Sequence, residues 1–339
     1  MIDLRAHADL SALNTFRLPG SARWLATVDS ADELAELVRD RRFAGMRRIV
    51  LGGGSNLVLR GGEINALLIR MGACAWRAVA QTGNRVVVEA DAGMGWHDLV
   101  TACVDAGYGG IENLALIPGT VGAAPVQNIG AYGIELKQVL QSVHAVHLQT
   151  GKCREFLRDE CRFGYRDSIF KHEAVQYGIV RVRLDLASDA PLVLDYRDLR
   201  DELLARGNPP LNRRIVYDMV CAIRSRKLPD PDLTGNVGSF FKNPVIPAAQ
   251  FASLQQRFPD IVGYPQASGD VKVAAGWLID HAGWKGRREG RAGVHERHAL
   301  VLINLGGATG SDVLALARQI VEDIRVRYGI ALELEPQLL

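Results

Sequence analysis

Cysteine is scarce in this sequence, and no two cysteines form a C-x-x-C pair. The five that occur are scattered along the chain: Cys74, Cys103, Cys153, Cys161 and Cys221. Disulfide-stapled secreted domains and structural zinc sites both depend on paired cysteines at short, regular spacings. We therefore expect reduced thiols, with no disulfide framework and no zinc site. Each thiol is more typical of a small core residue than of a nucleophile.

An excess of charge of one sign is missing too, since the formal net charge is only +2 at pH 7. The basic stretches "RDRRF" and "RSRK" are short and fit helix ends. Nucleic acids and anionic membrane surfaces attract concentrated positive charge, so we expect neither as a partner. A metal site is not expected either, because His295 and His298 in "VHERH" have no third ligand at a suitable spacing.

Long hydrophobic runs are also absent. The longest apolar stretches, such as "HALVLINL", are far shorter than the roughly 20 residues of a membrane helix. The start "MIDLRAHADLSALNTF" lacks the basic residues and apolar run of a signal peptide. These absences lead us to expect a cytoplasmic protein.

What the sequence does contain is the composition of a globular protein, with 48% hydrophobic and 23% charged residues. Its 339 residues exceed one ordinary core and predict two or three domains. Strand and helix signals alternate, as in mixed α/β proteins. Helical spacing of apolar residues predicts helices in "ADELAELVRD", after a Ser30 cap, and in "GWHDLVTACVDAG", ending at Gly107.

Three further elements are expected towards the C-terminus. Alternation in "GIVRVRLDLA" predicts a half-buried strand whose inner face carries the apolar residues Val180, Val182, Leu184 and Leu186. The following helix, "RIVYDMVCAIRSRK", stops at prolines and is a candidate domain boundary. A last helix is expected from a Ser311 cap to Gly329, followed by a short strand "IALELEP".

Three consecutive glycines, Gly52–Gly54, directly follow a predicted strand and precede Ser55 and Asn56. Such a run lets consecutive backbone N–H groups point inward as an anion-binding nest. It is neither a phosphate-binding Walker loop nor a dinucleotide fingerprint, because no Gly-Lys-Ser/Thr follows and no helix opens there. Taken alone, a plain strand-to-strand turn explains the run equally well.

The segment Glu112–Gly133 contains four glycines and two prolines in 22 positions, with little charge. It is too irregular for a helix or strand and too apolar for a solvated loop. Close backbone approach to a flat, partly apolar ligand carrying phosphates fits this composition, and a packed structural loop is the alternative. Two such loops suggest a nucleotide-like cofactor.

Charged and proton-bearing residues occur in three further segments. "CRFGYRDSIFK" contains Tyr165 and Arg166, and an arginine beside aromatics is either an ion-pair residue or a clamp for carboxylate or phosphate. "GNVGSFFKNP" places Ser239 between glycines and two phenylalanines, which fits a tight turn or a hydroxyl held into a pocket. "LELEP" carries Glu333 and Glu335 at alternate positions of the last predicted strand.

Taken in order, these segments resemble one family, the UDP-N-acetylenolpyruvoylglucosamine reductases, FAD enzymes of bacterial peptidoglycan precursor synthesis. The resemblance runs from "NTFRLPG" to "LELEP" and includes "GGGSN", "IPGTVGAAPVQNIGAYG", "RFGYRDSIFK", "RKLPDP", "GNVGSFFKNP" and "AAGWLID". One such motif is moderately specific, and all of them in this order are very specific. "VLDYRDLRDELL" around Tyr196 is similar to the substrate-capping insert of the family's longer, type I form.

The resemblance implies an α+β fold, with a two-part FAD-binding unit of the vanillyl-alcohol-oxidase type and a C-terminal α/β substrate-binding domain. Residues 1–70, joined by 330–339, would form the first FAD-binding part. Residues 71–213, with the insert near Tyr196, would form the second part, and residues 214–329 the substrate-binding domain.

The resemblance also implies roles for single residues. Catalytic roles carry over onto Arg166, Ser239 and Glu335. Substrate-binding roles carry over onto Tyr196, Lys227 and Asn243, with Tyr165 sharing the pocket. FAD contacts are expected in the two glycine-rich loops, at Gly52, Gly53, Gly54, Ser55, Asn56, Ile117, Pro118, Gly119, Gly122, Ala123, Gln127, Asn128 and Gly130.

The implied ligands are non-covalent FAD, NADPH as co-substrate and UDP-N-acetylglucosamine enolpyruvate as substrate, and we expect a monomer. The preference for NADPH over NADH comes from the family alone. The segment "HERHA" departs from the family pattern near the substrate nucleotide, and the sequence ends with "LEPQLL", so contacts there stay open. Either Lys227 or Lys242 could hold the substrate phosphates.

The expected chemistry explains these residue types. Hydride addition to the enolpyruvyl group leaves an enolate next to a carboxylate, and Arg166 would stabilise that charge. A protonated Glu335 would donate a hydrogen bond to it. Ser239 would then deliver a proton to carbon, a step that positioned general acids accelerate by about 10²–10⁴-fold.

Two other functions fit parts of the sequence. A flavin oxidase or dehydrogenase of the same superfamily would share the loops, but the covalent flavin links common there need a His or Cys that neither loop contains. A nucleotide-sugar-binding module without activity would have little reason to keep the arginine, serine and glutamate together.

Overall fold

The computed structural model describes residues 2–339, which form two compact units. The first unit comprises Met1–Ala8, Ala22–Gly54 and Ile64–Arg226, and the second comprises Asp9–Ser21, Ser55–Glu63 and Lys227–Leu339. The chain therefore passes between the units several times before it stays in the second. The three-domain division implied by the family remains a prediction.

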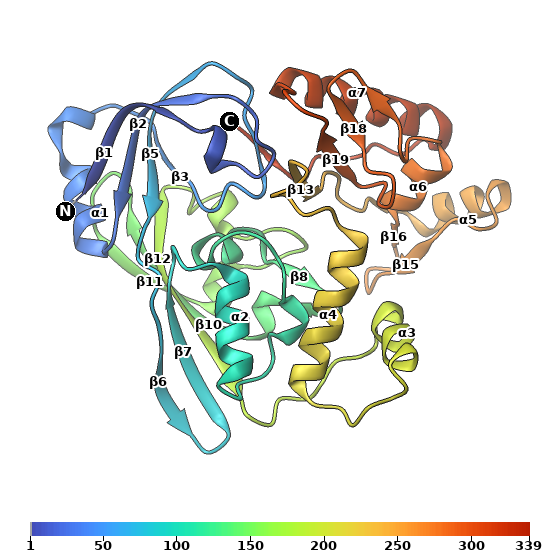
Figure 1. Ribbon diagram of the computed structural model, residues 1–339, viewed down its shortest axis with the longest axis horizontal. Helices are drawn as coiled ribbons and strands as arrows, with labels where there is room; N and C mark the ends of the chain where they lie inside the picture. Colours follow the sequence, from blue (N-terminus) through green and yellow to red (C-terminus); the bar gives the residue numbers. More distant parts are fainter. Residues whose placement is uncertain (1) are drawn as a thin grey trace. The chain divides into compact units, whose positions relative to one another are not determined.

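The first unit contains an antiparallel five-stranded sheet with the order β11-β10-β12-β7-β6 (Figure 1). Its strands are β6 (Trp76–Thr82), β7 (Arg85–Asp91), β10 (Leu140–His147), β11 (Cys153–Leu157) and β12 (Tyr177–Ala187). Helices α2 (Trp96–Asp105) and α4 (Arg213–Lys227) pack against one face and bury their apolar stripes there. Both helices were predicted from periodicity and are confirmed, with Gly107 at φ +83° after α2.

Strand β12 confirms the predicted alternation only in part. Val182, Leu184 and Leu186 are buried in the core beneath α2 and α4. The register shifts where His144 pairs with Arg181 but Ala145 pairs with Ile179. This bulge turns Ile179 into that core and lets Val180 pack against a second apolar cluster, so the prediction for Val180 was wrong.

The other face of the five-stranded sheet carries a charged cluster centred on Glu89 of β7, which is only 2% exposed. Its carboxylate accepts from Arg77 Nη2 at 2.6 Å and from Arg183 Nε at 2.8 Å. Arg181 Nε lies 3.6 Å away. Burial raises the pKa of Glu89, but the surrounding guanidinium groups outweigh that effect and the net shift is downward.

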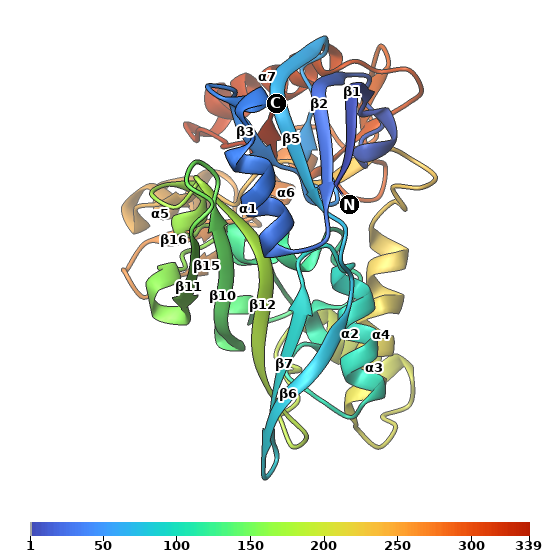
Figure 2. The ribbon, with the colours of Figure 1, turned by 90° about the vertical axis from the view of Figure 1, so that its left-hand side faces the viewer.

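A second sheet of the first unit has the order β1-β2-β5-β3. Its strands are β1 (Asp3–Asp9), β2 (Ser21–Val28), β3 (Arg48–Val50) and β5 (Glu63–Met71). Helix α1 (Ala31–Arg39) packs beside them, as Figure 2 shows, and buries Leu34, Leu37 and Val38. The predicted Ser30 cap is confirmed, since its side chain accepts from the N–H of Glu33 at 3.1 Å.

The glycine-rich segment predicted to be irregular forms short elements between α2 and β10. These are 3-10 turns at Glu112–Leu114, Val121–Gln127 and Leu136–Gln138, and the two-stranded β8 (Gly130–Ala131) and β9 (Ile134–Glu135). Helix α3 (Arg197–Ala205) follows the segment that contains Tyr196. Further 3-10 turns lie at Arg41–Phe43, Arg158–Cys161 and Ile169–Lys171 in this unit and at Ser11–Leu13 in the other.

The second unit is built on small sheets and three helices. One sheet has the order β13-β19-β18-β17 and another β14-β16-β15. Their strands are β13 (Asn236–Ser239), β14 (Val245–Ile246), β15 (Gly263–Pro265), β16 (Val271–Val273), β17 (Arg288–Glu289), β18 (Ala292–Val294) and β19 (Val301–Asn304). The helices are α5 (Ala248–Arg257), α6 (Ala275–His281) and α7 (Gly310–Tyr328).

Helix α7 ends where predicted, at Gly329 with φ +66°. The predicted Ser311 cap was wrong, because Thr309 caps the helix instead. The Thr309 hydroxyl accepts from the N–H of Asp312 at 3.3 Å, and the Asp312 carboxylate accepts from the N–H of Thr309 at 2.8 Å. This reciprocal capping box satisfies two amides that a cap at Ser311 would leave exposed.

The C-terminal strand also differs from its prediction. Within "IALELEP" only Leu334 pairs, in a single antiparallel bridge with Phe241. The strand proper is β20 (Gln337–Leu338), which pairs in parallel with β4 (Leu57–Val58). Among residues 2–339, no helix combines the length and the apolar character needed to cross a bilayer.

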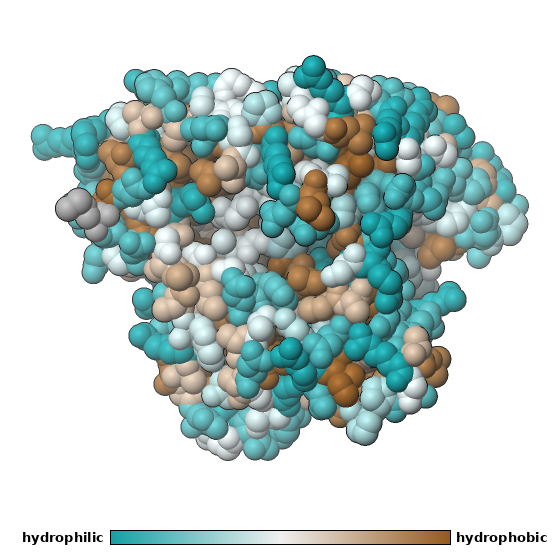
Figure 3. All heavy atoms as spheres, viewed as in Figure 1, coloured by the Kyte–Doolittle hydropathy of each residue, from teal (hydrophilic) through white to brown (hydrophobic). Residues whose placement is uncertain are grey.

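Exposed hydrophobic side chains are scattered over both units, and on the face drawn in Figure 3 they form separate brown patches among teal ones. Exposed apolar atoms of this kind are normal on globular proteins.

Candidate functional site

The two glycine-rich loops predicted to hold a cofactor lie against each other in the first unit. A Cβ added to Gly53 would stand 3.0 Å from the Cα of Gly119. One added to Gly52 would stand 3.0 Å from the Cβ of Ala123. Such distances are tighter than nine in ten real Cβ contacts, so a side chain at Gly52 or Gly53 would push the two segments apart by a few tenths of an ångström. The structure thus brings together two segments that the sequence places more than sixty residues apart.

The second loop is held by the residues that lead into α2. The N–H of Trp96 donates to the carbonyl of Gly119 at 3.0 Å, and the N–H of Val121 donates to Met94 at 2.9 Å. The indole of Trp96 donates to the carbonyl of Leu114 at 3.0 Å. Gly122 packs on Ala92, where an added Cβ would approach within 2.6 Å. Hydrogen bonds and packing from residues 92–96 therefore hold the second loop on one side, while its other side contacts Gly52 and Gly53.

Several amides of these loops have no acceptor in the part of the chain that the structure describes. The N–H groups of Gly52, Gly53 and Gly119 donate neither to backbone nor to side chains among residues 2–339. All three residues are half-buried. Amides without a protein acceptor in closely packed glycine segments suit an anionic group such as a cofactor phosphate. The loops therefore fit the cofactor that the sequence predicts.

Arg166 lies in the same unit and has a left-handed backbone with φ +54°. Its Nη2 donates to the carbonyl of Gly130 at 3.1 Å, and its own carbonyl accepts from Lys171 Nζ at 2.6 Å. The guanidinium lies 5.6 Å from the ring centre of Tyr165, which is 39% exposed. A non-glycine residue in this conformation costs about 1–3 kcal/mol, and strain of this kind is enriched at functional sites.

Asn128, a predicted cofactor residue, is fully buried and uses its amide within the protein. Its Nδ2 donates to Glu135 Oε2 at 3.1 Å and to the carbonyl of Gly164 at 3.0 Å. Its Oδ1 accepts from the N–H of Lys137 at 3.0 Å. Asn128 therefore ties the second glycine-rich loop to the turn that precedes Arg166.

Arg224 of α4 is a site residue that the sequence reasoning missed. Its Nε donates to the carbonyl of Leu116 at 3.3 Å. Burial lowers the pKa of the Arg224 guanidinium, the Tyr132 hydroxyl opposes that shift, and the charge of Arg166 adds to it. No carboxylate among the described residues forms an ion pair with Arg224. The charges of Arg224 and Arg166 act on each other, and such a concentration of positive charge favours an anionic ligand. The sequence did offer a signal: Arg224 lies three residues before Lys227, so the two basic side chains share one face of the predicted helix.

Tyr196 approaches this region through Tyr132, since the two rings meet edge to face at 5.5 Å. Burial raises the pKa of the Tyr132 hydroxyl. Asn113 links the segment that contains Tyr132 to the segment that leads to Tyr196, because its Nδ2 donates to the carbonyls of Tyr132 and Val193, each at 2.9 Å. Asn113 was another residue that the sequence reasoning missed. Gln127, Ile117 and Pro118 lie on the second loop, where the prediction placed them.

Ser239 belongs to the second unit, at the end of β13, where it pairs with Val301 of β19. The preceding residue, Gly238, has φ +71°, and its N–H donates to Asn236 Oδ1 at 2.9 Å. The predicted glycine turn is therefore present. The register shift between Asn236 and Ser239 shows that the turn interrupts the strand immediately before the serine. Ser239 itself is half-buried.

Glu335 lies on the segment that pairs with the residues after Ser239. Its N–H donates to the carbonyl of Phe240 at 3.0 Å. The carbonyl of Glu335 accepts from Asn56 Nδ2 at 3.3 Å, and the carbonyl of Asn56 accepts from the N–H of Gln337 at 2.9 Å. Asn56, predicted to contact a cofactor, therefore holds the Glu335–Gln337 segment through one hydrogen bond to each of these two residues. Ser55 and Asn56 belong to the second unit, whereas Gly52–Gly54 belong to the first.

The predicted substrate-binding residues after Ser239 also make contacts within the second unit. Lys242 Nζ lies 3.1 Å from the carboxylate of Glu333. Asn243 Oδ1 accepts from the N–H of Ala275 at 2.9 Å and so caps the start of α6. Lys227, the last residue of α4, is exposed.

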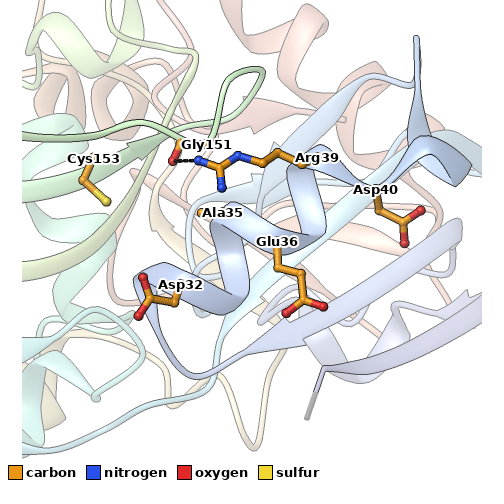
Figure 4. Close-up of a pocket in the computed structure, with 7 residues that line it drawn as sticks. All are labelled: Asp32, Ala35, Glu36, Arg39, Asp40, Gly151 and Cys153. Carbon is orange, nitrogen blue, oxygen red and sulfur yellow. Dashed lines mark hydrogen bonds between the residues drawn. The ribbon is translucent and has the colours of Figure 1, made fainter.

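A cavity of about 580 Å³ lies beside α1 in the first unit (Figure 4). It is lined by Asp32, Ala35, Glu36, Arg39, Asp40, Gly151 and Cys153. The guanidinium of Arg39 donates to the carbonyl of Gly151 at 3.1 Å across one side. No predicted site residue lines it. Within residues 2–339, no group of three or more His, Cys, Asp or Glu side chains could hold a metal ion.

Comparison with known proteins identifies both halves of the chain. A model of an FAD-binding domain matches residues 22–156, and a model of the C-terminal domain of UDP-N-acetylenolpyruvoylglucosamine reductase matches residues 230–339. The UDP-N-acetylenolpyruvoylglucosamine reductase of Pseudomonas aeruginosa is 50% identical over 337 residues, with 99% of each chain covered.

Comparison with solved structures leads to the same family and fold. The crystal structure of UDP-N-acetylenolpyruvylglucosamine reductase from Thermus caldophilus aligns with 100% of this chain and 98% of its own, at 26% identity and a TM-score of 0.67. A solvent-stable cholesterol oxidase aligns with 98% of this chain and 87% of its own, at 14% identity and a TM-score of 0.51, which is a likeness of fold. The predicted α+β fold, an FAD-binding unit followed by a distinct C-terminal domain, is confirmed.

Proposed function

Since the chain belongs to the family of UDP-N-acetylenolpyruvoylglucosamine reductases, we propose that it reduces the enolpyruvyl group of UDP-N-acetylglucosamine enolpyruvate to give UDP-N-acetylmuramate. The observation that carries this proposal is 50% identity with a reductase of that name over 99% of both chains. The activity belongs to the synthesis of peptidoglycan precursors. NADPH as the reductant, a monomeric state and a cytoplasmic location are predictions that follow from the family.

The loops around Gly52, Gly53 and Gly119 would hold FAD, because their glycines make a cradle and their amides lack acceptors in the described chain. Bound FAD would supply hydride for the substrate after accepting it from NADPH. The protein has two further tasks. It must stabilise the negative charge that develops on the reduced enolpyruvyl group, and it must deliver a proton to carbon.

Arg166 suits the first task. Its bond to the carbonyl of Gly130 and the strained backbone hold the guanidinium in one place, so little reorganisation is needed when charge appears. Arg224 would add positive charge beside it, in a buried setting where electrostatic effects are stronger than in water. Tyr165 and Tyr196 would line the same pocket.

Ser239 suits the second task as the proton donor. The left-handed turn at Gly238 interrupts β13 immediately before Ser239, and the pairing of Ser239 with Val301 of β19 then holds the serine backbone in place. Glu335, on the adjoining segment, would donate a hydrogen bond to the developing enolate in its protonated form. Lys227 or Lys242 would hold the substrate phosphates, and Lys242 would have to exchange its contact with the exposed carboxylate of Glu333 to do so.

The test is spectroscopic. Purified protein should be yellow, NADPH should bleach the flavin band, and UDP-N-acetylglucosamine enolpyruvate should restore it anaerobically. A bleached flavin that the substrate fails to reoxidise would contradict the proposed activity. Release of the flavin by acid precipitation would confirm that it is not covalently attached.

A further inference from the structure

His97, the second residue of α2, makes a hydrogen bond that no assigned role explains. Its Nδ1 accepts from the backbone N–H of Leu116 at 3.1 Å. Leu116 has φ +55°, a left-handed conformation that branched side chains rarely adopt. The next residues along the chain are Ile117, Pro118 and Gly119, which begin the proposed FAD loop. His97 therefore braces the strained residue from which this loop departs.

The hydrogen bonds around His97 select one tautomer. The Thr101 hydroxyl donates to the carbonyl of His97 at 2.9 Å, which uses its only proton. The Tyr217 hydroxyl, 2.8 Å from Thr101 Oγ1, must then donate to that oxygen. A lone pair of the Tyr217 hydroxyl oxygen then faces His97 Nε2, which lies 3.5 Å away. Nδ1 accepts and Nε2 carries the proton, so the ring is neutral.

The surroundings keep the imidazole neutral. Burial lowers the pKa of His97 and the charge of Arg224 on α4 lowers it further, while Asp98 on its own helix acts in the opposite direction. The Tyr217 ring stacks on the imidazole at 5.8 Å and 8°, and α4 also contributes the thiol of Cys221, which interacts with Tyr217. The pKa of Cys221 is raised by burial, so that thiol is uncharged at neutral pH.

We propose that His97 is a positioning residue for FAD, which holds Leu116 in its left-handed conformation only while its Nδ1 is unprotonated. Both backbone groups of Leu116 are hydrogen-bonded, since its N–H donates to His97 Nδ1 and its carbonyl accepts from Arg224 Nε at 3.3 Å. Protonation would turn the acceptor at Nδ1 into a donor that faces the N–H of Leu116. The loop would then lose its brace and FAD would bind more weakly in acid. This inference rests on the proposed FAD-binding role of the loop.

The decisive variant is His97→Asn, because the amide oxygen of asparagine can accept the Leu116 N–H in the place of Nδ1 but does not titrate. His97→Phe keeps a ring that can stack on Tyr217 and removes the acceptor. His147→Asn is the matched control. The Nδ1 of His147 also accepts backbone N–H groups, from Gln149 at 3.2 Å and Thr150 at 3.3 Å, but in an exposed turn of the β10–β11 hairpin.

The measurement is the dissociation constant of FAD, from flavin fluorescence between pH 5 and 8, with circular dichroism to verify folding. Wild type and His147→Asn should lose affinity in acid by about threefold to tenfold, the worth of one hydrogen bond. His97→Asn should bind FAD with little dependence on pH. At pH 8, His97→Phe should bind FAD about threefold to tenfold more weakly than wild type. If His97→Phe does not fold, His97→Asn decides.

The outcomes separate this inference from the proposed function. The same pH profile in wild type and His97→Asn, or a flat profile in wild type, would overturn the role of His97 and leave the FAD assignment intact. Failure of the folded wild type to bind FAD at every pH would overturn both. A ¹⁵N spectrum of the imidazole should show the Nε2–H tautomer at pH 7, and the other tautomer would contradict the geometry on which the inference stands.

Discussion

The backbone N–H of Glu335 donates to the carbonyl of Phe240 at 3.0 Å, so Glu335 is hydrogen-bonded to the residue that directly follows Ser239. Almost one hundred residues of sequence separate these two positions. The bridge between Phe241 and Leu334 and the bond from the N–H of Lys242 to the carbonyl of Glu333 continue the pairing. The proposed proton donor and the proposed carboxyl partner are therefore carried by adjoining backbone segments of one unit.

Ser239→Ala should uncouple the two half-reactions. Reduction of the flavin by NADPH should proceed at the wild-type rate, because no proton is delivered to carbon in that step. Reoxidation by the enolpyruvyl substrate should slow by about 10²–10⁴-fold, the usual worth of a positioned general acid. Anaerobic stopped-flow absorbance measures both rates. Ser268→Ala, at an exposed loop hydroxyl that contacts Asp270, is the control, and unimpaired reoxidation in Ser239→Ala would remove the serine from the mechanism.

Arg166→Gln should lower the rate of substrate reduction by about 10²–10³-fold, as expected when one preorganised donor to a developing anion is lost. Arg166→Lys should recover little, because a lysine lacks the planar fork of the guanidinium. Arg162→Gln is a matched control, since Arg162 also has a left-handed backbone, at φ +44°, but pairs with Glu173 on the surface. Steady-state kinetics would contradict the assignment if the two glutamine variants behaved alike.

Gly53→Ala should weaken FAD binding at least tenfold without unfolding the protein. Its new Cβ would stand 3.0 Å from the backbone of Gly119, so the two glycine-rich loops would have to separate. Gly276→Ala is the control, because a Cβ there meets the nearest atom of Leu300 at an ordinary 3.5 Å. Fluorescence titration with FAD compares the two. Equal affinities would show that the close approach of the loops is not needed for the cofactor.

Glu89 should make stability depend on pH. Its carboxylate has a lowered pKa in the folded state, so its contribution is present above the unfolded-state pKa and is lost as pH falls through the lower folded-state value. Glu89→Gln should destabilise the protein by about 1–3 kcal/mol at pH 7, since the arginines lose a buried acceptor charge. The difference from wild type should shrink in acid.

Urea unfolding of wild type, Glu89→Gln and the surface control Glu173→Gln from pH 7 down to pH 3 tests this expectation. A Glu89→Gln difference that stayed constant across that range would mean that the ionised carboxylate is not what stabilises the sheet.

Much of the local structure could be predicted because it depends on neighbours in the chain. The helices α1, α2 and α4 follow from apolar spacing and from turn residues such as Ser30 and Gly107. The glycine-rich loops were identified from composition, since glycine allows the backbone to approach a neighbour or a ligand closely. The wrong prediction of the α7 cap has a local cause as well. Thr309 caps the helix instead of Ser311 because it forms two reciprocal hydrogen bonds with Asp312.

The remaining site residues could not be found in this way. Arg224 looked like one more basic residue at a helix end, and its importance comes from burial beside Arg166 and Leu116. Asn56 looked like part of a phosphate loop, yet its side chain supports Glu335. Val180 faces a different core from the one its alternation predicts, because a bulge between β10 and β12 rotates the strand.

By itself, the sequence determined the family, the cofactor class and the residue types of the chemistry, because those depend on motifs that are contiguous along the chain. Only the tertiary structure decided which backbone groups meet: Gly53 with Gly119, Glu335 with Phe240, and Leu116 with both His97 and Arg224. These contacts join residues that are far apart in sequence. Their free energy comes from packing and from hydrogen bonds that exist only once the chain has folded, and local sequence patterns carry no record of them.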